Sequence, residues 1–211
     1  MNNPIIAICI NTFLRDNLLY KTLQTIVDNY TNECIVLLAD QGYADSEKDI
    51  TIDYYKSQIL LEYYRLPFDC GLGYAKNFLV QKASELQIPY CLIMPDSVQF
   101  TSVYNFSPLF NDLDTNTIIN FKLKNIEPII LKNIFIAKTN ILISLWDNEL
   151  KIYEYELAFA EGIKRNCKIK WVDNYNFKKI KSRSSEEYQS YCKRIKDFKR
   201  LSEQKLKELC I

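Results

Sequence analysis

The sequence predicts a single α/β domain in which helices cover both faces of a mostly parallel sheet. Short apolar, β-branched runs alternate with segments of helical periodicity in the order β-α-β-α-β-α-β. This order is typical of parallel strands joined by right-handed crossovers. The 211 residues, 48% of them hydrophobic, are enough for one domain with a full core and too few for two.

The first hundred residues contain the clearest pattern. Buried strands are expected at 4–10, 34–38, 58–64 and 89–94, and helices at 16–29, 45–57 and 74–86. The first helix has its apolar residues on one face and Asp16 as a candidate N-cap, and Asp45 or Ser46 is expected to cap the second.

The later part of the chain is less regular. Strands are expected at 117–123, 129–137 and 168–172, and a short helix at 154–166. A long amphipathic helix is predicted at 184–209, with Tyr188 and Tyr191 on its apolar face. From residue 178 onward, 11 Lys and Arg stand against 5 Asp and Glu. This excess indicates either a solvated basic face or a contact with an anionic partner.

The composition excludes several kinds of chemistry. The chain has no histidine, so a Ser-His or Cys-His nucleophile is impossible, and acid–base work falls to Asp, Glu, Lys or Tyr. The seven cysteines are odd in number and include no Cys-x-x-Cys pair. They indicate a reducing, cytoplasmic location and argue against structural zinc.

Charge and hydropathy exclude further partners. A net charge of +1 argues against nucleic acid as a partner. No stretch approaches 18 apolar residues, and the apolar run near the N-terminus is too short for a signal sequence, so no transmembrane segment is expected.

Polar side chains follow the predicted strands at the edge where open parallel sheets bind ligands. Asp40 and Asp96 come directly after the second and fourth strands, and residues 11–16 follow the first. Each acid alone is weak evidence, because Asp is common in turns and caps. Their joint position at one edge of the sheet is the informative feature.

The third strand leads into a glycine-containing turn. Gly71-Leu-Gly73 lacks the third glycine of a dinucleotide fingerprint and follows the third strand instead of the first, and the sequence has no P-loop. The helix that begins there is expected to offer free N–H groups to an anion, and Lys76 adds a positive charge one turn later.

Five segments in order resemble the motifs of the family 2 glycosyltransferases, which have the GT-A fold. Gly71-Leu-Gly-Tyr-Ala75-Lys76-Asn77 is similar to their Gly-x-x-x-Ala-Arg-Asn, and Leu92-Ile-Met-Pro95-Asp96-Ser97 falls where they carry Leu-Asp-Asp-Asp. Segments 4–15, 37–45 and 153–157 resemble their opening strand with Pro-Thr-Tyr-Asn-Arg, their Val-Asp-Asp-Gly-Ser-x-Asp and their Glu-Asp-x-Glu-Leu. The resemblance covers about residues 5–172.

The resemblance implies a GT-A, Rossmann-like domain and an activity. Residues 1–100 would form the nucleotide-binding half and 101–183 the acceptor half, followed by the C-terminal helix at 184–211. The chain would be an inverting, hexosyltransferase-type glycosyltransferase. It would move a sugar from a nucleotide-sugar, expected to be a UDP-sugar, to a hydroxyl of a glycan, lipid-linked or protein acceptor.

The resemblance also implies roles for single residues. Asp40 would bind the base, Lys76 would approach the diphosphate, and Asp96 would hold the ribose and a divalent metal. Glu154 is the expected catalytic base, with Glu156 as its rival, since a carboxylate must serve in a histidine-free chain. Nucleotide contacts are expected at Thr12, Arg15, Asp40, Gly71, Lys76, Asn77 and Asp96.

The departures from the family pattern leave alternatives open. Pro95 and Ser97 stand where many members carry Asp, so Mn²⁺ or Mg²⁺ would be weakly held, or the enzyme would work without metal. Asp173 could replace a missing ligand. A degenerate domain that binds nucleotide or glycan without turnover is a second interpretation. A nucleotidyltransferase is a third, but the sequence lacks the Gly-rich, basic first loop expected for it.

Overall fold

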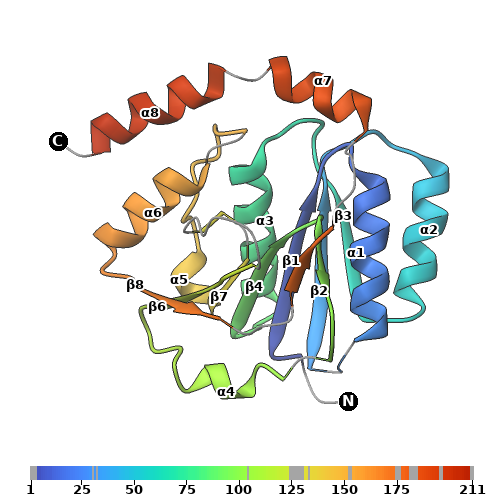
Figure 1. Cartoon of the computed structure of the whole chain (residues 1–211), viewed down its shortest axis with the longest axis horizontal. Coiled ribbons are helices and arrows are strands. Elements are labelled where there is room, and N and C mark those ends of the chain that lie inside the picture. The colour runs from blue at the N-terminus through green and yellow to red at the C-terminus, as the bar shows by residue number, and fades with distance from the viewer. Residues whose placement is uncertain are drawn as a thin grey trace.

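The computed structural model describes residues 4–29, 31, 33–103, 105–123, 131–132, 134–151, 154–173, 177–180, 185–194 and 197–209. A seven-stranded sheet lies at the centre, in the order β3-β2-β1-β4-β7-β6-β8 (Figure 1). Its strands are β1 (Ile6–Thr12), β2 (Cys34–Asp40), β3 (Leu61–Arg65), β4 (Tyr90–Pro95), β6 (Thr117–Phe121), β7 (Phe135–Lys138) and β8 (Lys168–Val172). Two further strands, β5 (Val98–Phe100) and β9 (Phe177–Lys179), form an antiparallel pair.

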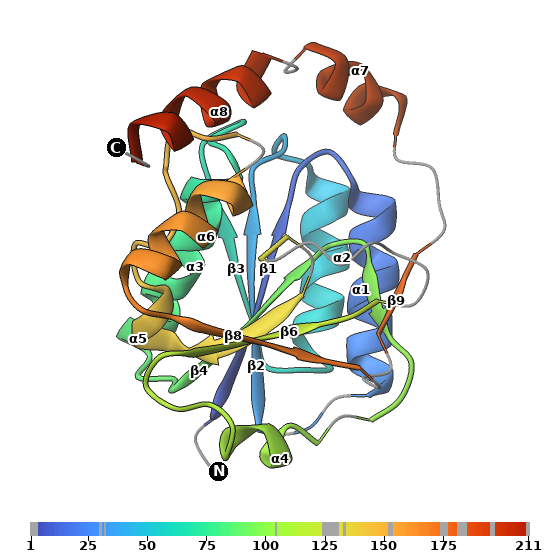
Figure 2. The ribbon, with the colours of Figure 1, turned by 60° about the vertical axis from the view of Figure 1, so that its left-hand side comes forward.

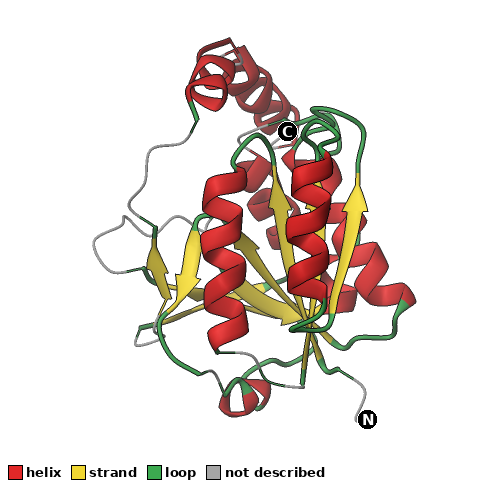
Figure 3. Ribbon diagram, turned by 90° about the vertical axis from the view of Figure 1, so that its right-hand side faces the viewer, coloured by secondary structure: helices red, strands yellow, loops and turns green. Residues whose placement is uncertain are grey.

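The helices connect and cover the strands. They are α1 (Asp16–Asp28), α2 (Ser46–Lys56), α3 (Leu72–Glu85), α4 (Ser107–Phe110), α5 (Thr139–Leu142), α6 (Glu154–Lys164), α7 (Glu186–Arg194) and α8 (Asp197–Leu209). Strand β7 is antiparallel to both of its neighbours, and the other pairs of the main sheet are parallel. The expected mostly parallel sheet with helices on both faces is therefore confirmed (Figure 3).

Two apolar cores lie on opposite faces of the sheet. Along β1, Ile6, Ile8 and Ile10 belong to the core that includes residues of α1 and α2, whereas Ala7 and Cys9 belong to the core under α3, α5 and α6. This alternation follows from the period of two of an extended strand. A strand that is apolar at every position must be covered on both faces.

Two expected local features are wrong. Asp16 does not cap α1, because Arg15 occupies the N-cap position. The Asp16 carboxylate instead forms an ion pair with Lys48, whose Nζ lies 2.6 Å from Oδ1. The strand expected at 129–137 begins only at Phe135, because Leu131 has a left-handed φ of 56° that cannot continue a strand. Residues 129, 130 and 133 lie outside the described ones. The cap at Asp45 is confirmed, since it accepts from the Glu47 amide.

The predicted C-terminal helix is two helices, α7 and α8, with residues 195 and 196 outside the described part. They contact different parts of the domain. Helix α7 lies against the segments that follow β1 and β3, and α8 packs on α6, where Ser202 is fully buried. Figures 1 and 2 show the pair lying over the carboxyl ends of β1, β2 and β3. Among the described helices, none is long and apolar enough to span a membrane.

Candidate active site

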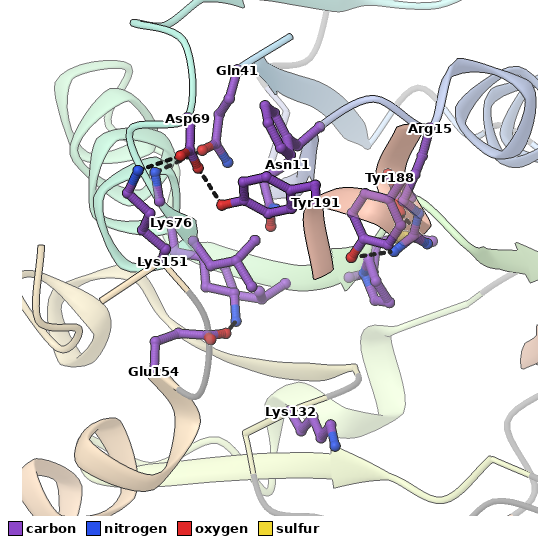
Figure 4. Close-up of a pocket in the computed structure, with 17 residues that line it drawn as sticks. Asn11, Arg15, Gln41, Asp69, Lys76, Lys132, Lys151, Glu154, Tyr188 and Tyr191 are labelled. Carbon is purple, nitrogen blue, oxygen red and sulfur yellow. Dashed lines mark hydrogen bonds and ion pairs between the residues drawn. The ribbon is translucent and has the colours of Figure 1, made fainter. Parts of the chain in front are cut away.

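A cavity of about 110 Å³ lies at the carboxyl ends of β1 and β4, between the first turns of α3 and α6 and beneath α7 (Figure 4). Its polar lining consists of Asn11, Arg15, Gln41, Asp69, Lys76, Asp96, Lys132, Lys151, Glu154, Tyr188 and Tyr191. The strand ends determine this location, because side chains that follow parallel strands gather at one edge of the sheet.

Asp96 lies at the base of the cavity and is 3% exposed. Arg15 Nη2 lies 2.6 Å from one carboxylate oxygen, and the Thr12 hydroxyl donates to the other at 2.8 Å. Burial raises the pKa of Asp96 to about 6, against the opposing effects of the Arg15 charge and the Thr12 hydroxyl. The structure therefore brings together three of the expected nucleotide-binding residues: Thr12, Arg15 and Asp96.

Glu154 and Lys76 form a buried ion pair on the opposite wall. Lys76 Nζ lies 2.6 Å from Glu154 Oε1, and the two residues are 6% and 3% exposed. Lys76 also lies over the ring of Trp146, 5.6 Å from its centroid. Because Glu154 begins α6, its carboxylate is also stabilised by the positive end of that helix. A carboxylate placed here can accept a proton from a hydroxyl that enters the cavity.

Helix α7 closes the cavity with two tyrosines. The Tyr191 hydroxyl donates to Asp69, which also pairs with Lys151. The Tyr191 ring packs edge-on against Phe13, with 4.7 Å between the ring centroids. The Arg15 guanidinium lies over the ring of Tyr188, 5.0 Å from the ring centroid. Figure 4 shows these two side chains next to each other. Burial raises the pKa of Tyr191, and its hydrogen bond to Asp69 acts in the same direction. Both tyrosines line the cavity.

The glycines after β3 have a packing role. Gly71 has a φ of 98°, which is unfavourable for other residues, and a Cβ on Gly73 would lie 1.9 Å from the Asp147 carbonyl oxygen. Both glycines let α3 approach the 147–151 segment. The expected free N–H groups are not free, because Gly71 donates to Gln41 Oε1 and the Leu72 and Gly73 amides donate to carbonyls of that segment.

Four of the expected site residues lie outside the cavity lining: Thr12, which reaches it only through Asp96, and Asp40, Asn77 and Glu156. The buried Asp40 accepts from Lys48 Nζ and the Tyr63 hydroxyl, each at 2.8 Å, and from the Gly42 amide. Asn77 donates to the Trp146 carbonyl at 2.6 Å and so holds the 146–148 segment. Glu156 faces α8, where the Ser202 hydroxyl lies 3.4 Å away.

Several lining residues were missed by the motif comparison. Gln41, one residue beyond Asp40, is 2% exposed and its Nε2 is buried without a hydrogen-bond partner. Asp69 and Lys151 pair across 82 residues, and the two α7 tyrosines arrive from the C-terminal segment. The only sequence signal for Gln41 was its place after a strand. The others become neighbours only through the fold.

The described residues do not fit a divalent metal. Each carboxylate that lines the cavity already has a cationic partner: Asp96 has Arg15, Glu154 has Lys76, and Asp69 has Lys151. Within the described part of the chain, no group of three or more Cys, Asp or Glu side chains could hold a metal ion. Asp173 is no substitute, because it is exposed and pairs with Lys122.

Comparison with known proteins gives similarity in structure alone. No protein family matches the sequence, and no curated protein matches it. S. aureus TarS (residues 1–349, with UDP-GlcNAc) aligns with a TM-score of 0.66 and 14% identity over 85% of this chain and 59% of its own. The mannosyltransferase PcManGT from Pyrobaculum calidifontis, with GDP-Man and Mn²⁺, aligns at 0.68 and 9% over 90% of this chain and 60% of its own.

GalNAc-T7, solved with UDP, GalNAc and Mn²⁺, gives a TM-score of 0.64 at 12% identity, over 86% of this chain and 43% of its own. The chain thus spans about 60% or less of the length of these proteins. All three are glycosyltransferases of the GT-A type. The sheet order, the cavity at the strand ends and these alignments show that the chain has the GT-A glycosyltransferase fold.

Proposed function

We propose that this chain is an inverting glycosyltransferase that transfers a sugar from a UDP-sugar to a hydroxyl group. The observation that carries the proposal is that buried Glu154 lines the same cavity as Asp96, at the carboxyl ends of a GT-A sheet. Similar proteins with bound UDP-GlcNAc, GDP-Man or UDP support a nucleotide-sugar donor. The acceptor is a glycan, lipid-linked or protein hydroxyl.

Glu154 acts as the general base in this proposal. It takes the proton of the acceptor hydroxyl as the acceptor oxygen bonds to the anomeric carbon and the bond to the diphosphate oxygen breaks. Lys76, 2.6 Å away, holds the carboxylate in place and shifts toward the diphosphate as its charge develops. The step as proposed uses side chains alone, and each carboxylate of the cavity already pairs with a cation.

A second candidate function is nucleotide or glycan binding without turnover. Pro95 and Ser97 flank Asp96, so the acidic motif keeps one acid, and α7 leaves a cavity of only about 110 Å³. The location proposed for either activity is the cytoplasm. The described cysteines form no disulfide bond with one another, which fits a reducing compartment.

The two functions differ in donor turnover. Hydrolysis of a panel of nucleotide-sugars separates an enzyme from a binder, and the active donor is then used with hydroxyl acceptors. Glu154→Gln keeps the shape and removes the base, so turnover should fall about 10²–10⁴-fold. Glu156→Gln is the matched control, because Glu156 lies outside the cavity lining and faces Ser202. Near-normal turnover by Glu154→Gln would reject this base.

A further inference from the structure

Each carboxylate of the cavity is neutralised by a Lys or Arg side chain that also lines the cavity. Arg15, Lys76 and Lys151 each pair with one of its three acids, and Lys132 also lines the cavity, with its ammonium 5.0 Å from the ring centroid of Tyr155. The four cations exceed the three acids by one charge. An entering diphosphate therefore meets a set of positive side chains that can re-pair with its oxygens.

Arg15 occupies the place on Asp96 that a metal ion would need. Its Nη2 lies 2.6 Å from Asp96 Oδ1, and Thr12 donates to Oδ2, so both carboxylate oxygens are engaged. A guanidinium cannot lose its charge in a protein. A divalent ion on Asp96 would have to displace Arg15 and would place its charge beside that partly buried guanidinium, which is costly.

Arg15 keeps donors for a second partner while it holds Asp96. Its Nη1 has only a long contact of 3.5 Å with the Tyr188 hydroxyl, and its Nε is buried without a hydrogen-bond partner. The fork of a guanidinium can pair with a carboxylate through one nitrogen and with a phosphate through others. One side chain can therefore link the acidic motif to a diphosphate, as a metal ion would.

We propose that the donor diphosphate is bound without a divalent metal, by a side-chain cation set in which Arg15 replaces the metal on Asp96. Lys76 and Lys132 are the further members of this set. The inference rests on the proposed function, because it concerns the same nucleotide-sugar site.

The direct test is calorimetric titration of the whole chain with UDP and with GDP, once in EDTA and once with saturating Mn²⁺. The expected result is a dissociation constant for the preferred nucleotide that changes less than about twofold between the two conditions, or about 0.4 kcal/mol. Binding that needs Mn²⁺, or improves tenfold or more with it, overturns the inference and leaves the proposed function standing. Failure of both nucleotides to bind under either condition overturns both.

Variants of Arg15 identify the group that replaces the metal. Arg15→Gln should weaken UDP binding in EDTA about 10- to 100-fold, because a charge-assisted phosphate contact is lost. It also releases the Asp96 carboxylate, so Mn²⁺ should now restore part of the affinity. Arg15→Lys keeps the charge and should retain metal-independent binding within about tenfold.

The matched control is Arg65→Gln. Arg65 pairs with Asp49 on the surface and does not line the cavity, so its loss should leave UDP binding unchanged in either condition. Thermal melting of each variant establishes that it is folded. Equal UDP binding by Arg15→Gln and the unaltered chain would show that Arg15 does not hold the diphosphate, whatever the metal dependence.

Discussion

Asp96 is a carboxyl group almost removed from water, with a guanidinium against it. Burial makes the charged form unfavourable, whereas Arg15 and Thr12 favour it, and burial has the larger effect on the pKa, which rises to about 6. A similar balance governs Lys48, which is 2% exposed and pairs with both Asp16 and Asp40. The stability of the domain therefore depends on each of these buried charges keeping its partner.

The raised pKa of Asp96 predicts how stability depends on pH. Between the unfolded value of about 4 and the folded value of about 6, the folded chain holds a proton that the unfolded chain has lost. The contribution of Asp96 is therefore fully present below pH 4 and is lost as pH rises through 6, by an amount on the order of 3 kcal/mol.

Denaturant unfolding of the unaltered chain and of Asp96→Asn at several pH values between 4 and 8 measures this contribution. As pH rises, the unaltered chain should lose unfolding free energy relative to Asp96→Asn. Other titrating groups cancel in that difference. Parallel stability curves would contradict the assignment of the raised pKa to Asp96.

At the scale of elements, α7 contributes two side chains to the cavity from the far C-terminal part of the chain. Its Ser185 hydroxyl, one residue before the helix, donates to the Leu14 carbonyl at 2.8 Å, and Tyr188 and Tyr191 line the cavity. The remaining 110 Å³ is well below the roughly 300–1,000 Å³ of small-molecule sites. Helix α8 is anchored separately, since Lys205 pairs with Asp147 and Glu149. At Lys205, the basic C-terminal segment thus binds acids of its own domain.

We expect α7 to shift when nucleotide binds, so weakening its closed position should raise affinity. Tyr191→Ala removes the contact with Phe13 and the hydrogen bond to Asp69. If only part of the population is open, the apparent dissociation constant exceeds the intrinsic one by the inverse of that fraction. UDP should therefore bind Tyr191→Ala more tightly than the unaltered chain.

Tyr191→Phe keeps the ring and loses only the hydrogen bond, so its UDP affinity should lie between the other two. Fluorescence or calorimetric titration measures all three proteins. Weaker binding by Tyr191→Ala would instead mean that α7 closes over bound nucleotide and contributes contacts to it.

At the scale of the whole molecule, the two apolar cores hold the strand ends in a fixed arrangement, so a ligand bound there stabilises the entire domain. UDP at 100 times its dissociation constant should add about 2.7 kcal/mol to the free energy of unfolding. We expect a larger melting shift with UDP than with GDP or ADP. Equal shifts with the three nucleotides would contradict a UDP-sugar donor.

Gln41→Glu tests how the base is recognised in the same melting experiment. The buried, unpartnered Nε2 of Gln41 is a donor suited to a base carbonyl, while its Oε1 accepts from Gly71. Glutamate keeps an oxygen for Gly71 and replaces the donor with an acceptor. The variant should lose most of the UDP shift if Gln41 contacts the base. Asp40, already engaged by Lys48 and Tyr63, would then be a supporting residue.

The sequence alone determined the alternating strands and helices of the first hundred residues and the edge of the sheet that carries the site. Alternating apolar positions such as Ile6 and Ala7 require two covered faces, and chain direction places the residues that follow parallel strands at one end. This is why Thr12 and Asp96 could be assigned to one site from local pattern and motif resemblance.

Only the tertiary structure decided which side chains meet there. Lys76 and Glu154 are 78 residues apart, Asp69 and Tyr191 are 122 apart, and neither pair has a local periodicity that would reveal it. The same holds for Asp40, whose carboxylate is engaged by Lys48 from the next helix and Tyr63 from the next strand. Local sequence period is set by backbone geometry, whereas these partners are set by the order of strands and the docking of α7, which depend on packing of the whole chain.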